Sequence, residues 1–291
     1  MPHAYLPHRG VLRVSGAEAR PWLNNIVTCD LGDLLPGAPR FGALLTPQGK
    51  ILFDFLVFAG NAAATEIYLD TDRASVPELA RRLTFYRLRA KVVIEDLASP
   101  PAAGERWGVV TQWNETGVPT PEEAVGGPDP RHAGLGLRWL LPEHAAKTFG
   151  QADIAGYEAL RIGLGIPESP GDFAYGEAFP HETLMDMLGG IDFRKGCYVG
   201  QEVVSRMQHR GTARTRLVPV AAPALPPAGS ELTAGDKVVG HMGSSAGDKG
   251  LAMLRLDRVQ EAFAAGAPLT GVGGPLTLQR PGWWNAAWPA D

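Results

Sequence analysis

The pattern of apolar and polar positions divides most of the chain into short β-strands joined by turns. Apolar runs with strand character cover residues 10–14, 66–69, 91–95, 107–111 and 137–141. Residues 41–58 contain two such runs on either side of Pro47-Gln48-Gly49, where proline fixes φ and glycine accepts a positive φ. This stretch therefore predicts a β-hairpin. Residues 115–136 are rich in Gly and Pro, which predicts a loop.

Helical spacing interrupts the strands. Residues 76–88 place Leu79, Leu83 and Tyr86 on one face, which predicts an amphipathic helix. Residues 201–210 combine an apolar stripe with a Glu–Arg pair at i, i+4, the order that stabilises a helix.

Two further helices are predicted from their end signals. Residues 15–18, Ser-Gly-Ala-Glu, have the form of a capping box and predict a helix start, with Pro21 in the first turn. Asp153 is a good N-cap, and the helix that it begins is expected to stop among the glycines and proline of residues 163–167.

The composition changes at residues 221–229, AAPALPPAG. Short apolar runs separated by glycine turns follow at residues 237–242, 251–256 and 275–279, and helical spacing returns only at residues 259–265. We therefore expect an α+β region over residues 1–220 and a small all-β unit over residues 221–291.

Composition and charge set the broad class of the protein. With 45% apolar and 20% charged residues, the 291-residue chain is globular in composition. Its net charge of −4 disfavours broad, non-specific nucleic-acid binding, so RNA is not the expected partner, and an RNA-binding module on the basic residues 194–216 is kept only as a third alternative. Two cysteines are too few for a disulfide framework, and we see neither a signal peptide nor a membrane segment. These features predict a cytoplasmic protein that does not enter a membrane.

The stretch RKGCYVGQE, residues 194–202, places Cys197 just ahead of a predicted helix. The positive end of a helix and neighbouring basic residues lower the pKa of a thiol, and the thiolate is the form that attacks electrophiles or binds soft metals. The residues alone leave four interpretations open: a spectator, a nucleophile, a redox thiol or a metal ligand. Cys29, by contrast, is interpreted as a small buried apolar group.

A metal site made by this chain alone is not indicated, because no second cysteine or H-x-x-x-H pair lies at ligand spacing. A cluster held by Cys197 would need ligands from a partner, a second copy or a small thiol. Two basic stretches, residues 81–91 and 194–216, suggest an anionic ligand, although such charge runs are also typical of solvated helix faces.

KGCYVGQE, followed by Arg206 and Arg210-Gly211, resembles the signature of the YgfZ family. That family comprises bacterial folate-binding proteins and mitochondrial iron–sulfur assembly counterparts, and it is related to the aminomethyltransferase (T protein) of the glycine cleavage system. The likeness extends through RVSGAEARPWLNNIVTCDL, LLTPQGKILFDFLVF, YEALRIGLGIPE, FPHE and GHMGSS…GLAMLRLD. It covers most of the chain.

The resemblance implies an α+β fold: a three-subdomain, T-protein-like ring with a central folate channel and a C-terminal small antiparallel β-barrel. The two subdomains within residues 1–220 would be interleaved in sequence. Cys197 would be the functional thiol and a shared or transient ligand of an iron–sulfur cluster. Tetrahydrofolate or a derivative would be the cofactor, and the candidate folate-binding residues are Lys195, Tyr198, Gln201, Glu202, Arg206, Arg87 and Arg89.

The sequence departs from the T proteins at two acidic positions. Phe53 stands where T proteins carry a catalytic carboxylate, and Gly163 stands where they carry a pterin-binding glutamate. Phenylalanine can neither accept a proton nor offset a developing positive charge. We therefore expect a tetrahydrofolate-binding accessory protein for iron–sulfur cluster assembly or repair, with assembly or client proteins as partners. The alternative is a tetrahydrofolate-dependent aminomethyl or one-carbon transferase in which Asp54 does the acid–base work.

Overall fold

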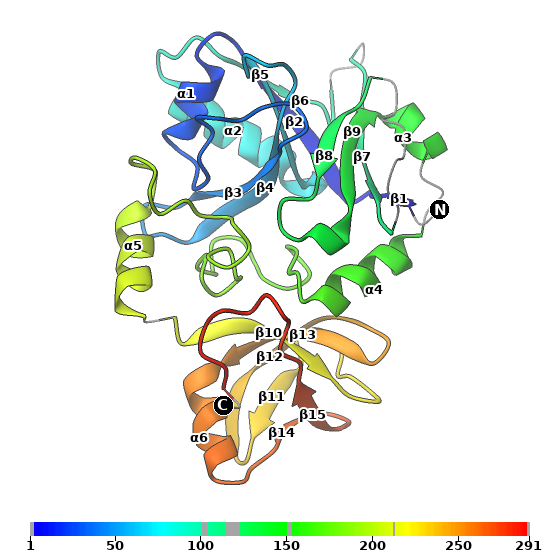
Figure 1. Ribbon diagram of the computed structural model, residues 1–291, viewed down its shortest axis with the longest axis vertical. Helices are drawn as coiled ribbons and strands as arrows, with labels where there is room; N and C mark the ends of the chain where they lie inside the picture. Colours follow the sequence, from blue (N-terminus) through cyan, green and yellow to red (C-terminus); the bar gives the residue numbers. More distant parts are fainter. Residues whose placement is uncertain (1–2, 101–103, 115–122, 150–152, 212, 290–291) are drawn as a thin grey trace. The chain divides into compact units, whose positions relative to one another are not determined.

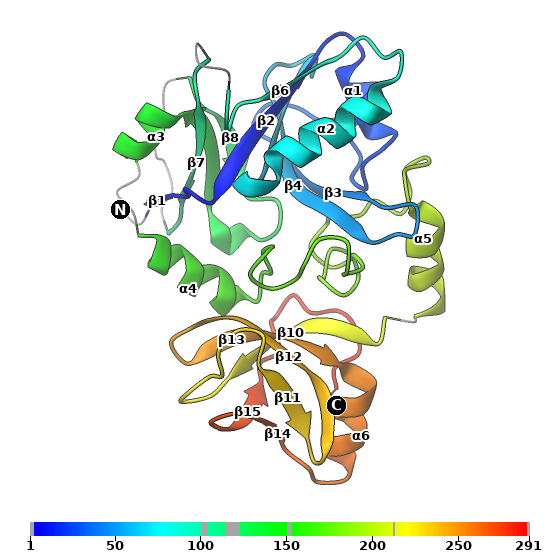
Figure 2. The same ribbon diagram turned by 180° about the vertical axis from the view of Figure 1, so that it is seen from behind.

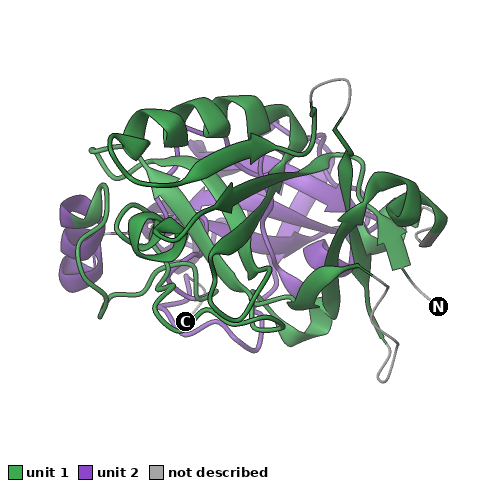
Figure 3. Ribbon diagram, turned by 90° about the horizontal axis from the view of Figure 1, so that it is seen from above, with its two compact units in different colours: residues 1–157, 188–201 green, residues 158–187, 202–291 purple. Residues whose placement is uncertain are grey.

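A computed structural model describes residues 3–100, 104–114, 123–149, 153–211 and 213–289 (Figure 1). The chain divides into two compact units, residues 1–157 with 188–201 and residues 158–187 with 202–291 (Figure 3). None of the helices in the described ranges has the length and apolar content that crossing a membrane requires.

The first unit contains a five-stranded antiparallel sheet in the order β3-β4-β5-β2-β6. Its strands are β2 (Arg9–Ser15), β3 (Arg40–Leu45), β4 (Ile51–Ala59), β5 (Glu66–Asp72) and β6 (Val93–Asp96). The helix α2 (Val76–Arg87) packs against β2 and β6, and its buried residues are Val76, Leu79 and Leu83 (Figure 2). The predicted hairpin is confirmed as β3 and β4, and Gly49 has the positive φ, +83°, that its turn requires.

A second sheet in this unit has the order β1-β7-β9-β8. Its strands are β1 (His3–Tyr5), β7 (Trp107–Gln112), β8 (Val125–Pro128) and β9 (Leu137–Pro142), with α3 (Glu143–Phe149) against β7 and β9. The prediction of a loop over residues 115–136 is therefore wrong at β8 and at the short helix η2 (Ala133–Leu135). Gly126 is needed in β8 because a Cβ there would lie 2.2 Å from the Arg138 carbonyl oxygen. Residues 115–122 of the predicted loop lie outside the described residues.

The N-terminal helix α1 (Ala19–Asn24) does not begin with a capping box. Ser15 is the last residue of β2, and the Glu18 carboxylate instead accepts a hydrogen bond from the Lys91 backbone N–H at 3.0 Å. The expectation fails because pairing of Ser15 with two neighbouring strands outweighs its capping tendency. Pro21 does lie in the first turn of α1, as predicted.

The second unit contains a closed six-stranded antiparallel barrel in the order β10-β13-β12-β11-β14-β15. The strands are β10 (Thr215–Ala221), β11 (Glu231–Ala234), β12 (Lys237–Ala246), β13 (Lys249–Arg255), β14 (Leu269–Gly271) and β15 (Gly274–Leu278). One helix, α6 (Leu256–Ala264), interrupts them. The predicted domain boundary at residue 221 stays a prediction. The strand β10 precedes that boundary and belongs to the barrel.

Two helices flank the segment that carries the cysteine motif. Asp153 precedes α4 (Ile154–Leu164) and its side chain accepts the Gly156 N–H at 2.8 Å, so it acts as the predicted N-cap. The helix stops at Gly165, whose φ is +77°. The predicted helix over residues 201–210 is confirmed as α5 (Gln201–Arg210).

Candidate functional site

The loop before Cys197 is anchored to the N-terminal part of the first unit. Asp192 donates its backbone N–H to the Thr28 carbonyl at 3.0 Å, and the Thr28 hydroxyl donates to the Gly190 carbonyl at 2.6 Å. The Asp192 carboxylate in turn accepts the backbone N–H groups of Arg194 and Lys195. This turn fixes the chain immediately upstream of the cysteine.

Lys195 adds a second anchor to this loop. Its ammonium donates to the carbonyl oxygens of Asn24, Val27 and Cys29 at 2.6, 2.9 and 2.7 Å. Asn24 is the last residue of α1, so the charge also lies at the negative end of that helix. Burial lowers the pKa of Lys195 below its ordinary value. The sequence predicted this charge for the thiol or for folate, and that role stays a prediction; in the structure the ammonium contacts three backbone carbonyls and the Asn24 side chain.

Side chains of the motif alternate between the interior and the solvent. Tyr198 is buried, its ring centroid lies 5.7 Å from the Lys195 ammonium, and burial raises the pKa of its hydroxyl to about 12. Cys197 is exposed, and an added Cβ at Gly196 would meet nothing within 4 Å. The motif therefore presents its thiol to solvent between the half-buried Lys195 and the buried Tyr198.

Gly200 joins this loop to α5 at a position that only glycine fits. Its φ is +82°, and an added Cβ would lie 2.5 Å from the carbonyl oxygen of Thr46 in the β3–β4 turn. Gln201 begins the helix and its side-chain amide points back to the Gly196 carbonyl, at 3.5 Å. The glycine thus sets where α5 starts and packs the loop against the hairpin.

Glu202 and Arg206 form an ion pair at 2.6 Å on α5, with side chains that are 86% and 54% exposed. Such exposed pairs are worth little to stability. Both residues were predicted to bind folate, and their partners in the structure are each other.

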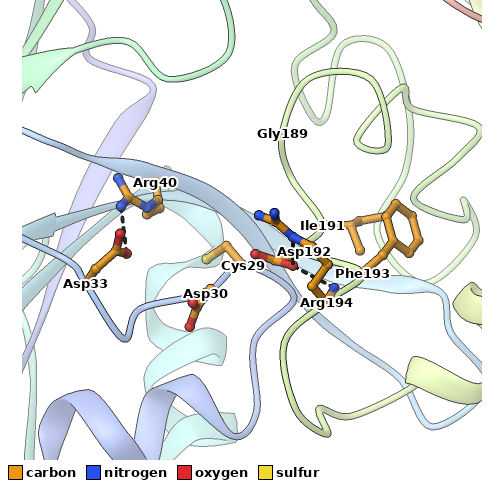
Figure 4. A pocket seen from close by; sticks show the side chains of 9 residues that line it. All are labelled: Cys29, Asp30, Asp33, Arg40, Gly189, Ile191, Asp192, Phe193 and Arg194. Atoms are coloured by element: carbon orange, nitrogen blue, oxygen red, sulfur yellow. Dashed lines mark hydrogen bonds and ion pairs between the residues drawn. The ribbon is translucent and has the colours of Figure 1, made fainter.

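A pocket of about 520 Å³ lies beside the loop, within the first unit (Figure 4). It is lined by side chains of both charges and by apolar groups: Cys29, Asp30, Asp33, Arg40, Gly189, Ile191, Asp192, Phe193 and Arg194. Arg194 precedes Cys197 by three residues, so their Cα atoms are at most about 11 Å apart. Sequence reasoning missed this pocket because its two halves lie far apart in the chain and share no motif.

Cys29 lies at the edge of this pocket but is 3% exposed, which confirms its interpretation as a buried apolar group. An added Cβ at Gly42 of β3 would lie 2.5 Å from the Cys29 sulfur, so the thiol packs directly on that strand. Burial raises the pKa of Cys29 to about 12. This thiol is protonated and enclosed at neutral pH.

The structure does not bring the remaining predicted residues into this pocket. Phe53 and Asp54 lie on β4, where both are buried, and the Thr71 hydroxyl donates to the Asp54 backbone carbonyl at 2.8 Å. Arg87 ends α2, and it and Arg89 are exposed. Across the described ranges, no group of three or more potential metal ligands at ligating distance includes Cys197.

Comparison with known proteins assigns a family. The family described as CAF17, C-terminal beta-barrel domain, matches residues 214–286. The mitochondrial iron–sulfur cluster assembly factor IBA57 of Homo sapiens is 30% identical over 304 residues, which span 96% of this chain and 84% of the human protein. The chain belongs to the IBA57 family. The IBA57 homolog of Aspergillus fumigatus is 29% identical over 91% of this chain and 72% of its own length.

A solved structure supports the fold of this IBA57 family member. The glycine cleavage system aminomethyltransferase T from Bartonella henselae superposes with a TM-score of 0.73, covers 98% of this chain and 87% of its own, and is 13% identical. Together with the closed barrel, this confirms the predicted T-protein-like α+β fold. The central folate channel stays a prediction.

The cytoplasmic location predicted from the sequence is contradicted by these relatives. The IBA57 proteins of Aspergillus fumigatus, Homo sapiens and Mus musculus are all named as mitochondrial. The prediction used the low cysteine count and the lack of a long apolar segment. These features separate reducing from oxidising environments, and they do not separate one reducing compartment from another.

Proposed function

We propose that this protein is an iron–sulfur cluster assembly or repair factor in which Cys197 is the thiol that contacts the cluster. The observation that carries the proposal is the exposed Cys197 on a loop fixed by Lys195 and Gly200, in a chain that belongs to the IBA57 family. Thiolate sulfur is the ligand that iron–sulfur clusters prefer, and an exposed thiol can reach a cluster carried by another protein.

The proposed contact is shared and transient. One cysteine cannot complete the coordination of a cluster, and Cys29 is too deeply buried to assist. The cluster is therefore cargo whose other ligands come from a partner assembly or client protein. A fixed backbone serves this role because it presents the sulfur without an ordering cost at each encounter.

The test of this proposal is complementation in cells that lack their own factor. Cys197→Ser is expected to fold and accumulate normally yet fail to restore the activity of an enzyme that needs a 4Fe–4S cluster. Cys29→Ala serves as the matched control and is expected to restore that activity at the wild-type level once its expression is equal. Full restoration by Cys197→Ser would remove the special role of this thiol.

Tetrahydrofolate remains the predicted ligand, and we propose that it occupies the pocket beside the loop. Arg40 and Arg194 offer two guanidinium groups for the carboxylates of the glutamate tail, and Phe193 and Ile191 offer apolar surface for the ring. Asp30 offers an acceptor for the N–H groups of the pterin. Asp54, on which the alternative one-carbon transferase would depend, is buried on β4.

A fluorescence titration with tetrahydrofolate tests the ligand and its position. We expect the wild type to bind and Arg40→Ala/Arg194→Ala to bind at least about tenfold more weakly, since each lost charged hydrogen bond costs roughly 1.5–3 kcal/mol. Loss of binding in Arg87→Ala/Arg89→Ala instead would move the site to the end of α2. A wild type that does not bind would remove folate from the proposal and leave the role of Cys197 standing.

A further inference from the structure

The segment from the last turn of α2 to the start of β6 carries an unusual concentration of exposed apolar side chains. Phe85, Leu88 and Val93 are 74%, 88% and 54% exposed. They are three of the seven large apolar side chains that are exposed in the described part of the chain, and they fall within nine consecutive residues. Single exposed apolar residues are ordinary, whereas a cluster of them marks an interaction surface.

Basic side chains alternate with these apolar residues along the chain. Arg87, Arg89 and Lys91 are all exposed, and no acidic residue occurs between residues 81 and 93. The whole chain has a net charge of −4, so this local excess of positive charge runs against the overall balance. We call the six side chains of Phe85, Arg87, Leu88, Arg89, Lys91 and Val93 the 85–93 patch.

The backbone holds Leu88 outward in a strained conformation. Its φ and ψ are 46° and −106°, which a residue with a Cβ adopts at a cost of about 1–3 kcal/mol. The turn is nevertheless fixed: the Ala90 N–H donates to the Arg87 carbonyl at 2.8 Å. The Trp22 indole N–H donates to the Tyr86 carbonyl at 3.3 Å. This turn exposes Leu88 to solvent, so no buried apolar area within the chain offsets the strain. A contact with another molecule would offset it.

We propose that the 85–93 patch docks a partner protein whose contact surface is an apolar pocket bordered by aspartate and glutamate. Phe85 and Leu88 are the anchors that such a pocket would enclose, and Arg87, Arg89 and Lys91 pair with the acidic border. Phenylalanine and arginine are enriched in protein interfaces, and a preorganised turn reduces the ordering cost of binding. This surface is separate from the cysteine loop and the folate pocket and does not depend on either.

Two other occupants fit the patch less well. If a second copy of this chain bound through the same patch, Arg87, Arg89 and Lys91 of the two copies would face each other, and their like charges would repel. A bilayer is better bound by a long amphipathic helix or a lipid anchor than by three apolar side chains on one fixed turn. An acidic protein surface satisfies both the charge and the small apolar area.

Fluorescence anisotropy with defined probes tests the proposal on the full chain. The probe is a fluorescein-labelled amphipathic helical peptide of leucine and glutamate, and its matched counterpart has lysine in place of every glutamate. We expect the acidic peptide to bind and the basic one not to bind. Binding should weaken as salt rises because the charged border is exposed.

Variants assign the binding to the patch. We expect two double variants, Phe85→Ser/Leu88→Ser and Arg87→Glu/Arg89→Glu, each to lower the affinity for the acidic peptide by at least about tenfold, as the loss of a hot-spot residue does. Leu35→Ser/Val272→Ser removes apolar side chains that are 51% and 78% exposed elsewhere and should leave binding unchanged. Lys237→Glu/Arg258→Glu is the matched control for charge. All four variants should unfold at the wild-type temperature.

Three results would overturn the proposal. The first is a wild type that fails to bind the acidic peptide or binds both peptides equally. The second is patch variants that bind as the wild type does. The third is patch-dependent binding to phosphatidylcholine–phosphatidylserine vesicles, or patch-dependent dimerisation in sedimentation, without binding to the peptide.

Discussion

The two cysteines of this chain belong to the same unit and have opposite environments. Cys29 is 3% exposed, packs on Gly42 and has its pKa raised to about 12 by burial. Cys197 is exposed on a loop that the half-buried Lys195 and the buried Tyr198 hold in place. The two segments are also joined, because the Lys195 ammonium binds the carbonyl oxygen of Cys29 at 2.7 Å. The buried segment thus supports the backbone that exposes the other thiol.

This contrast shows what the KGCYVGQE motif does physically. Lys195 and Tyr198 fasten the loop from the inside, Gly200 fits against the hairpin turn, and Cys197 is left outside. Three of the eight motif residues therefore hold the loop in place. In the proposed function, this loop holds one sulfur atom at a defined place on the surface.

The largest expected difference between the two thiols is in their reactivity. Under native conditions at neutral pH, iodoacetamide should alkylate Cys197 about a hundredfold faster than Cys29, because burial denies the reagent access and suppresses the Cys29 thiolate. Raising the pH toward 12 should narrow the ratio as Cys29 ionises. Peptide mass spectrometry measures both rates in one sample. Equal rates at neutral pH would show that Cys29 is not enclosed.

A smaller effect is expected at the two glycines of the motif. Gly200→Ala should lower the free energy of unfolding by about 2–3 kcal/mol, because its φ is positive and its Cβ would strike the Thr46 carbonyl. Gly196→Ala faces open space and should change that energy by less than about 0.5 kcal/mol. Urea denaturation measures both. A similar loss in the two variants would mean that the loop is not packed on the hairpin.

The smallest expected effect concerns the two basic residues before Cys197. Lys195→Met leaves three carbonyls without their donor and should cost about 1–2 kcal/mol of unfolding free energy, a value reduced because the ammonium is only half-buried. Arg194→Met should cost less than about 0.5 kcal/mol, since its side chain is 93% exposed. A larger loss of unfolding free energy in Arg194→Met than in Lys195→Met would show that Lys195 does not anchor the loop.

Local chemistry made part of this structure predictable. The β3–β4 hairpin, α2 and α5 follow from apolar periodicity and from Gly49, whose conformation is set within its own turn. The capping box at Ser15 failed because strand pairing overrode a local preference. In the barrel, the predicted strands at β12, β13 and β15 are confirmed, whereas the short β11 and β14 carry too few residues for a pattern.

The candidate site was predictable only in part, for a different reason. Cys197 was visible from its motif, but the partners of Lys195 are backbone carbonyls, which carry no sequence signature. The pocket joins residues near Asp30 to residues near Asp192, and only the folded chain brings these together. Arg87 and Arg89 were assigned to folate from a basic stretch and the family resemblance, and that assignment stays a prediction; the exposure of Phe85 and Leu88 beside them is visible only in the folded chain.

The most direct test of the central claim is whether an iron–sulfur cluster protects Cys197. The pure protein would be incubated without oxygen with a cluster-loaded scaffold protein, treated with iodoacetamide and mapped by mass spectrometry. We predict that Cys197 is alkylated without the cluster and protected in its presence, while labelling of Cys29 stays low in both samples. Alkylation of Cys197 at the same rate with and without the cluster would contradict the account.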